Sequence, residues 1–167
     1  MAETQLQQRG QQWLETFLKF ADFPATVTAE VRETFAEKSC WLTINHTALQ
    51  PNQLEALLGS KGAVLDSIQY LASSILNIGQ GEQMAYTIEL NGYREKRHQE
   101  LLEIAENAAA EVRETGREYE IKSLSSAERR QVHSILQGSE DIETFSRGQE
   151  PDRRLVVKLV GAVSDED

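Results

Sequence analysis

Residues 57–68 read Leu57-Leu58-Gly59-Ser60-Lys61-Gly62-Ala63-Val64-Leu65-Asp66-Ser67-Ile68, with two glycines between two apolar helical patterns. Glycine adopts backbone conformations that other residues avoid, and its missing side chain lets a ligand approach the backbone amides. The helix expected after Gly62 turns its positive end and its unpaired N–H groups towards the loop, and Lys61 adds a full charge. Phosphate suits this environment. On its own, however, Gly-x-x-Gly is more often a plain turn, because glycine ends many helices for structural reasons alone.

The sequence around this loop predicts a helix, two strands, two helices and a strand, in that order. Apolar residues at helical spacing predict helices over residues 6–20, 51–58 and 63–77. Alternation of apolar and polar residues predicts strands over residues 25–35, 40–45 and 84–90. Glu37-Lys38-Ser39 is expected to be the turn of a hairpin between the first two strands. These elements make up a complete small α+β unit.

The rest of the chain predicts a second unit with the order helix, strand, helix, strand, strand. A charged helix with one apolar face is expected over residues 94–115, with Gly116 as its C-cap. A strand over 119–122 precedes Ser125-Ser126-Ala127-Glu128, a Ser-x-x-Glu capping box that opens a helix running to Gln137. Strands over 142–146 and 153–160 follow, joined by a turn at 148–151. The fold class is therefore α+β, with two small domains.

The helix that follows the capping box places two basic residues on one face. Arg129 and His133 are four residues apart and lie beside the apolar stripe. Arginine offers a planar fork of donors, and histidine donates a hydrogen bond when neutral and adds a charge when protonated. Both side chains can reach one phosphate. The alternative is a surface arginine beside a partly buried, structural histidine.

Both halves of the chain resemble known nucleic-acid-binding domains. Residues 57–68 resemble the core signature of a KH domain, and the surrounding order (αββααβ) is that of the bacterial, type II form. This implies a loop that clamps a single-stranded backbone and an apolar groove that holds the bases. Residues from 94 onward resemble the R-3-H domain (αβαββ), which is named for its Arg-x-x-x-His motif. The stretches that carry this likeness are 111–118, 127–133 and 143–151 with Arg153-Arg154.

A KH domain followed by an R-3-H domain is the arrangement of the Jag family of bacterial RNA-binding proteins, which the chain resembles over nearly its whole length. The expected limits are a KH domain over 1–92, an R-3-H domain over 93–162 and an acidic tail over 163–167. We expect a short form without the family's N-terminal Jag domain and linker. Lys122-Ser123-Leu124-Ser125 also replaces the family's proline-containing lead into the motif helix.

The resemblance implies a protein that binds the phosphate backbone of single-stranded RNA, or of single-stranded DNA. The resemblance also allows a role in post-transcriptional control of cell elongation or division. The protein partner that it allows is either a small KH-only protein or a second copy of this chain in a homodimer. Further charge is expected from Arg94, Lys96 and Arg97. The residues expected to contact nucleic acid are Gly59, Ser60, Lys61, Gly62, Leu65, Arg129, Arg130, His133, Arg153 and Arg154.

Composition narrows the remaining classes of function. A net charge of −10 restricts nucleic-acid binding to local sites, because the affinity that does not depend on sequence comes from lysine and arginine. Cys40 is single, so it is expected to be a buried small hydrophobe, and the three histidines have no zinc-ligand spacing. No metal or cofactor is expected. Without a long apolar run or a signal peptide, we expect no membrane insertion and a cytoplasmic location.

Two other classes of function compete with nucleic-acid binding. In the first, the KH fold serves as a protein interaction or dimerisation surface and the acidic net charge keeps nucleic acid away. The second is an enzyme, for which the sequence offers no Ser-His-Asp order, P-loop, carboxylate pair or metal set in a recognisable context. We therefore expect no enzymatic activity.

Overall fold

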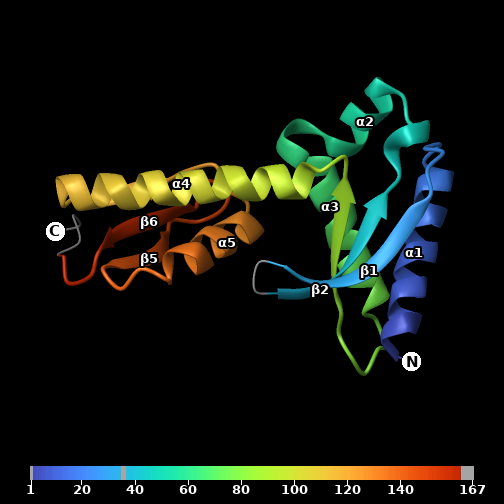
Figure 1. The fold of residues 1–167 in the computed structure, drawn as a ribbon, viewed down its shortest axis with the longest axis horizontal. Helices are drawn as coiled ribbons and strands as arrows, with labels where there is room; N and C mark the ends of the chain where they lie inside the picture. The colour runs from blue at the N-terminus through green and yellow to red at the C-terminus, as the bar shows by residue number, and fades with distance from the viewer. Residues whose placement is uncertain (1, 35–36, 163–167) are drawn as a thin grey trace. The chain divides into compact units, whose positions relative to one another are not determined.

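The computed structural model describes residues 2–34 and 37–162, and the predicted acidic tail over 163–167 lies outside these ranges. The chain divides into two compact units, Met1–Arg94 and Glu95–Asp167 (Figure 1). Both units combine helices with a β-sheet, so the predicted α+β class is confirmed. The domain limits given above stay a prediction.

The first unit has the predicted order of helices and strands. Its elements are α1 (Ala2–Phe20), β1 (Val27–Thr34), β2 (Glu37–Ile44), the single-turn helix η1 (His46–Ala48), α2 (Pro51–Leu58), the turn η2 (Ser60–Gly62), α3 (Ala63–Leu76) and β3 (Ala85–Leu90).

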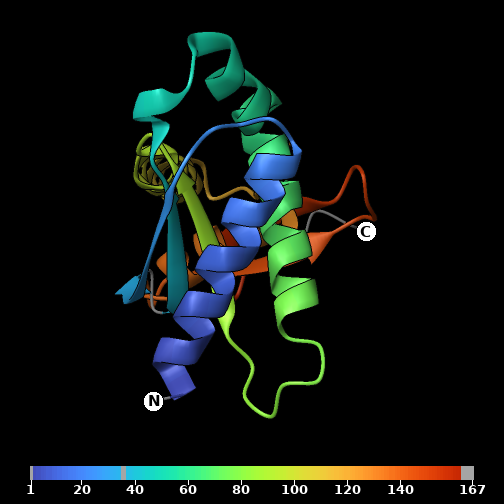
Figure 2. The ribbon, with the colours of Figure 1, turned by 90° about the vertical axis from the view of Figure 1, so that its right-hand side faces the viewer.

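These strands form a three-stranded sheet in the order β1-β2-β3. β1 and β2 are antiparallel, with Val27 opposite Ile44, whereas β2 and β3 are parallel. The parallel pair requires a crossover, and α2 and α3 supply it. α1 and α3 lie side by side against the sheet (Figures 1 and 2). The turn between α2 and α3 is therefore held by a helix packed on the sheet.

The core of the first unit lies between the sheet and these two helices. Leu14 and Leu18 of α1 and Leu65 of α3 are fully buried there. Cys40 of β2 is also fully buried, as predicted. Burial, and secondly the negative charge of Glu3, raise the pKa of the Cys40 thiol to about 11.

The predicted hairpin turn at residues 37–39 is wrong, because these residues belong to β2. The ladder between β1 and β2 continues as far as the pair Thr34 and Glu37. Ser39 is buried, and its hydroxyl is 3.0 Å from that of Thr87 on β3. The polar residues of this stretch are thus strand residues whose pairing outweighs their local turn preference.

The second unit also has the predicted order of elements. α4 (Tyr93–Thr115) begins within the first unit and continues into the second. The remaining elements are β4 (Tyr119–Ile121), α5 (Ser126–Leu136), β5 (Ile142–Arg147) and β6 (Arg154–Leu159). Its antiparallel sheet has the order β4-β6-β5. The core residues of this unit are Leu101, Ala105, Ala108, Ala109, Val112, Ile121, Leu124, Val132, Leu136, Ile142, Leu155 and Val157.

Both helix ends predicted in this unit are confirmed. Gly116 follows α4 with φ of +68°, and its amide donates to the Val112 carbonyl at 2.9 Å. At the start of α5, the Ser125 hydroxyl accepts from the Glu128 amide at 3.2 Å. The Glu128 carboxylate in turn accepts from the Ser125 amide at 2.9 Å. This reciprocal pair is the capping box predicted from the sequence.

Candidate functional site

The Gly-x-x-Gly loop turns the chain sharply between α2 and α3. Gly59 has φ of +69° and ψ of −176°, a combination that is essentially restricted to glycine. Lys61 (φ +52°, ψ +34°) and Gly62 (φ +76°, ψ +12°) both adopt left-handed conformations. A Cβ atom on Gly59 would lie 2.4 Å from Cγ2 of Val64, so this glycine is also required by close packing. The loop conformation is therefore determined within the protein itself.

The middle of this loop is exposed and offers unused donors. Ser60 and Lys61 are exposed, whereas Gly62 is buried. Within residues 2–34 and 37–162, the backbone amides of Ser60 and Lys61 donate to no protein acceptor. The N-terminus of α3 follows immediately, and its positive end favours negative charge. Two free amides, a lysine and a helix N-terminus together suit an anion such as phosphate.

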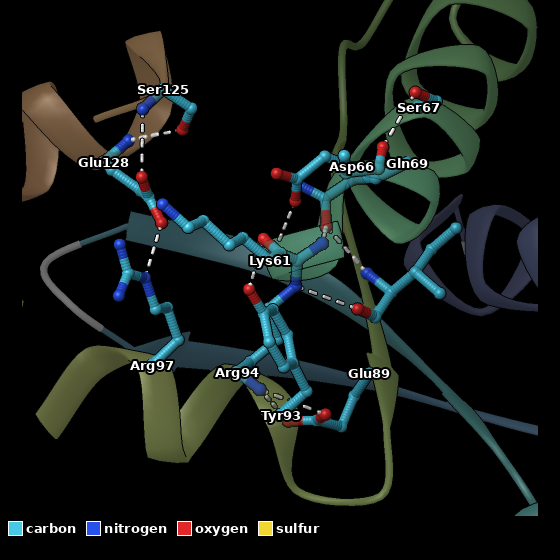
Figure 3. Close-up of polar contacts among 12 residues, drawn as sticks. Lys61, Asp66, Ser67, Gln69, Glu89, Tyr93, Arg94, Arg97, Ser125 and Glu128 are labelled. Atoms are coloured by element: carbon cyan, nitrogen blue, oxygen red, sulfur yellow. Dashed lines mark hydrogen bonds and ion pairs between the residues drawn. The ribbon is translucent and has the colours of Figure 1, made fainter. Parts of the chain in front are cut away.

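The start of α4 supports this loop from one side (Figure 3). The Tyr93 hydroxyl donates to the Lys61 carbonyl at 2.7 Å. The guanidinium of Arg94 binds Asp66 at 2.6 Å and the Ile88 carbonyl at 3.0 Å. Arg94 therefore links α3 to β3, and its charge is already paired.

Leu65 is the first predicted site residue that needs correction. Its side chain is fully buried in the core of the first unit, together with Ile68 and Ala72 of the same helix. The first turns of α3 place this position against the sheet, so it stabilises the fold and does not offer a surface to a base.

A second candidate site is a pocket of about 270 Å³ in the second unit. α5, β5 and the residues before β6 surround it. Arg129, Arg130, His133 and Arg153, all predicted from the sequence, line this pocket together with Ser126, Thr144, Phe145, Ser146 and Leu155. The structure thus brings four of the predicted basic residues to one place.

Arg129 is buried in the wall of this pocket, with a relative exposure of 5%. Its guanidinium donates to the Leu124 carbonyl at 2.7 Å, to the Arg153 carbonyl at 3.4 Å and to the Ser126 hydroxyl at 3.1 Å. It also forms an ion pair with Glu150. Protein groups thus already bind the Nη1 and Nη2 groups of Arg129, which agrees with a structural role, and its contact with phosphate stays a prediction.

His133 lies half-buried beside Arg129 on the same face of α5. Its Nδ1 contacts the Thr144 hydroxyl on β5, and its Nε2 is 2.9 Å from the Gln137 side-chain amide. If the amide donates to Nε2, the proton of the neutral ring is on Nδ1 and is donated to Thr144. The imidazole is therefore oriented by two neighbours.

Arg153 and Arg154 follow one another but differ in surroundings. Arg153 is exposed and lines the pocket. Arg154 forms an ion pair with Glu120 of β4 at 2.8 Å, and this hydrogen bond is the main reason that the pKa of the Glu120 carboxyl is lowered. Glu120 therefore balances the charge of Arg154 in this structure, and the contact of Arg154 with nucleic acid stays a prediction. Arg97 is paired likewise, with Glu128 (Figure 3) and with Glu100.

The structure adds residues that were not predicted from the sequence. Thr144 and Phe145 line the pocket from β5, and Tyr93 supports the loop. Thr144 was detectable in principle, because strand alternation places it on the same face of β5 as Ser146, which also lines the pocket. The role of Tyr93 depends on a contact between residues far apart in sequence, so no local pattern indicates it.

Residues 2–34 and 37–162 offer neither a membrane-spanning helix nor a cluster of metal ligands. No helix there is both long enough and apolar enough to cross a membrane. The same residues contain no group of three or more histidine, cysteine, aspartate or glutamate side chains placed to hold a metal ion.

Comparison with known proteins relates part of the second unit to one domain family and nearly the whole chain to one group of proteins. The R-3-H domain family matches residues 99–159. A protein named "RNA-binding protein KhpB" from Clostridium symbiosum is 29% identical over 154 residues, which cover 92% of this chain and 66% of that protein.

Two further relatives carry the same name. The one from Streptococcus pneumoniae serotype 2 is 31% identical over 109 residues, covering 65% of this chain and 33% of that protein. The one from Bacillus subtilis is 30% identical over 103 residues, covering 60% of this chain and 50% of that protein. The chain thus aligns with between 33% and 66% of the length of these three relatives.

Proposed function

We propose that the chain is a member of the Jag family, to which the KhpB proteins belong, and that it binds single-stranded RNA through the phosphate backbone. The relatives are named RNA-binding proteins, which is not an enzymatic kind of function. The R-3-H domain over residues 99–159 supports nucleic-acid binding by the second unit. A regulatory role in cell elongation or division, a small KH-only partner and a cytoplasmic location stay predictions.

In this proposal the first unit is a type II KH domain over residues 1–92. The order of its elements, the parallel pair of β2 and β3 and the Gly-x-x-Gly turn between α2 and α3 support this assignment. The observation that carries the function is the exposed loop with unused amides at Ser60 and Lys61. These amides and the Lys61 ammonium would bind one phosphate group at the N-terminus of α3.

The second unit is proposed as an R-3-H domain over residues 93–162. Arg130 and Arg153 bring positive charge to the pocket, and His133 lies in its wall. Arg129 supports the pocket through the carbonyls of Leu124 and Arg153. Phosphate binding by this unit therefore depends mainly on Arg130, His133 and Arg153.

A double substitution in the loop tests the proposed function. Ser60→Asp with Lys61→Asp places negative charge where phosphate is expected, and we expect the affinity for single-stranded RNA to fall by about tenfold or more. The measurement is the fluorescence anisotropy of a labelled, unstructured RNA, with circular dichroism to verify folding.

The matched control is Thr16→Asp with Lys19→Asp, which makes the same change in net charge on exposed positions of α1. This control is expected to bind RNA nearly as the unmodified chain does. If the loop variant were folded and bound as tightly as the control, the proposal would be wrong for the first unit.

The alternative function, an interaction or dimerisation module, has one observation in its favour. Tyr70, Leu71, Ile75 and Ile78, on α3 and just after it, expose apolar side chains. Stable self-association by sedimentation, together with no RNA binding at low salt, would favour this alternative.

A further inference from the structure

Tyr93, the first residue of α4, lies directly against the Gly-x-x-Gly loop. Its hydroxyl donates to the Lys61 carbonyl at 2.7 Å (Figure 3). Its side chain also occupies the space beside Gly62, where an added Cβ atom would lie 2.3 Å from the hydroxyl oxygen and 2.5 Å from Cε1. Tyr93 thus contacts both residues that form the second half of the loop.

The contact fixes the part of the loop whose conformation is least favourable. Lys61 is not a glycine and has φ of +52°, a conformation that persists only where surrounding structure holds it. The bond from Tyr93 holds the carbonyl of Lys61, which belongs to the peptide group between Lys61 and Gly62. The same peptide group carries the Gly62 amide, which faces the Gly59 carbonyl at 3.4 Å. Both ends of this peptide group are therefore held by the protein.

Hydrogen bonds of Glu89 and Arg94 fix the start of α4, where Tyr93 lies. The Glu89 carboxylate accepts from the backbone amides of Leu90 at 2.7 Å and of Arg94 at 3.1 Å. Glu89 is buried, so this cap is protected from solvent. The neighbouring Arg94 binds Asp66 of α3 and the Ile88 carbonyl of β3. Tyr93 therefore extends from a helix start that is hydrogen-bonded to both α3 and β3.

We propose that Tyr93 is a positioning residue for the phosphate site, which sets the Lys61–Gly62 peptide group so that the amides of Ser60 and Lys61 face outward. This inference rests on the proposed function of the loop. Tyr93 acts through the backbone of Lys61, and its ring lies against a buried glycine. The loop is then arranged before the ligand arrives, which spares the ordering cost that a mobile loop would have on binding.

Tyr93→Phe removes the hydroxyl and keeps the ring, and it is the variant that tests the inference. We expect its affinity for a labelled single-stranded RNA to fall by about threefold to tenfold, the effect of one lost hydrogen bond. In ¹H–¹⁵N spectra without RNA, the Ser60, Lys61 and Gly62 amide signals should move. Adding RNA should then shift the Ser60 and Lys61 signals less than in the unmodified chain.

Tyr70→Phe is the matched control, because Tyr70 lies on α3 with a side chain that is 73% exposed. It removes a tyrosine hydroxyl from the same unit and should leave the loop signals and the affinity unchanged. Thermal melting of both variants should stay close to that of the unmodified chain, so that the loop signals report position and not unfolding.

The outcomes separate this inference from the proposed function. If the double aspartate variant loses RNA binding while Tyr93→Phe binds normally with unmoved loop signals, Tyr93 does not position the loop. If neither the double aspartate variant nor Tyr93→Phe changes RNA binding, while Tyr93→Phe but not Tyr70→Phe moves the loop signals, the proposed function fails, and Tyr93 orders the loop without serving a phosphate site. Equal loop shifts in Tyr70→Phe and Tyr93→Phe would overturn the inference in either case.

Discussion

The guanidinium of Arg129 joins three parts of the second unit. It binds the Leu124 carbonyl before α5, the Ser126 hydroxyl in its first turn and the Arg153 carbonyl before β6. A buried carbonyl that loses its donor keeps the full cost of desolvation. Arg129 is therefore expected to contribute to stability as well as to the shape of the pocket.

Arg129→Met tests this role, because methionine fills similar space without donating hydrogen bonds. We expect the free energy of unfolding to fall by about 1–3 kcal/mol, since two carbonyls lose their donor. Urea unfolding followed by circular dichroism measures the change. Arg130→Met is the control on an exposed neighbour, expected within about 0.5 kcal/mol of the unmodified chain but weaker in RNA binding. If Arg129→Met kept full stability and lost only RNA binding, Arg129 would instead be a direct contact.

At the scale of single residues, the sequence predicted where basic side chains lie better than it predicted the protein groups to which they bind. The spacing of Arg129 and His133 predicted one face of the helix, and the structure adds that both line one pocket. It did not reveal that carbonyls distant in sequence occupy the Arg129 donors, or that Glu120 neutralises Arg154. Both facts depend on how strands and loops meet in the folded unit. Leu65 differs, because the helical period that buries Ile68 and Ala72 also places residue 65 inside.

Among the helices, α5 has the start that was best defined by the sequence. The Ser-x-x-Glu pattern gave both hydrogen bonds of the capping box between Ser125 and Glu128. Such a cap satisfies two amides that have no partner within the helix. Because α5 carries the pocket residues Arg130 and His133, its first turn bears directly on the candidate site.

Ser125→Ala is expected to lower the free energy of unfolding by about 1 kcal/mol, because the first turn of α5 loses the hydroxyl that accepts from Glu128. For a small domain this corresponds to a fall in melting temperature of roughly 4–8 °C, measurable by thermal denaturation. Ser134→Ala, at an exposed position inside α5, should leave stability unchanged or slightly higher, since alanine favours helices. Equal losses in both variants would contradict the capping role.

The elements themselves were largely predictable, and the failure at residues 37–39 has a clear cause. Glu37, Lys38 and Ser39 are polar, which locally favours a turn. In the fold they extend β2, because the ladder to β1 reaches Thr34 and the Ser39 hydroxyl meets Thr87. Cross-strand pairing is decided by partners far along the chain, and a window of neighbouring residues does not contain them.

Across the chain, many of the lysine and arginine side chains form ion pairs with carboxylates. In the second unit Arg97, Arg113, Arg147 and Arg154 each bind at least one carboxylate. This pairing takes up much of the positive charge, so in a chain with a net charge of −10 the binding of nucleic acid depends on local basic sites. Lys61 in the loop and Arg153 in the pocket wall are exposed cations that can face a ligand.

Salt dependence of RNA affinity tests this distribution of charge. Single-stranded nucleic acid gives a slope of roughly −0.7 in log affinity against log salt for each phosphate contact, so the change in slope on removing one arginine reports whether that arginine contacts phosphate. Arg153→Ala should reduce the magnitude of this slope by about 0.7, and Arg154→Ala, whose charge Glu120 already balances, should leave it unchanged. Anisotropy titrations at several salt concentrations give these slopes. Equal changes for both arginines would contradict the assignment.

The close fit between Gly62 and Tyr93 limits which sequences this fold can accept. A side chain at position 62 would overlap the tyrosine ring, and the left-handed backbone there disfavours any replacement. Shrinking residue 93 would relieve the overlap but also remove the bond to Lys61. The two positions therefore show epistasis, since the tolerance of one to mutation is set by the identity of the other.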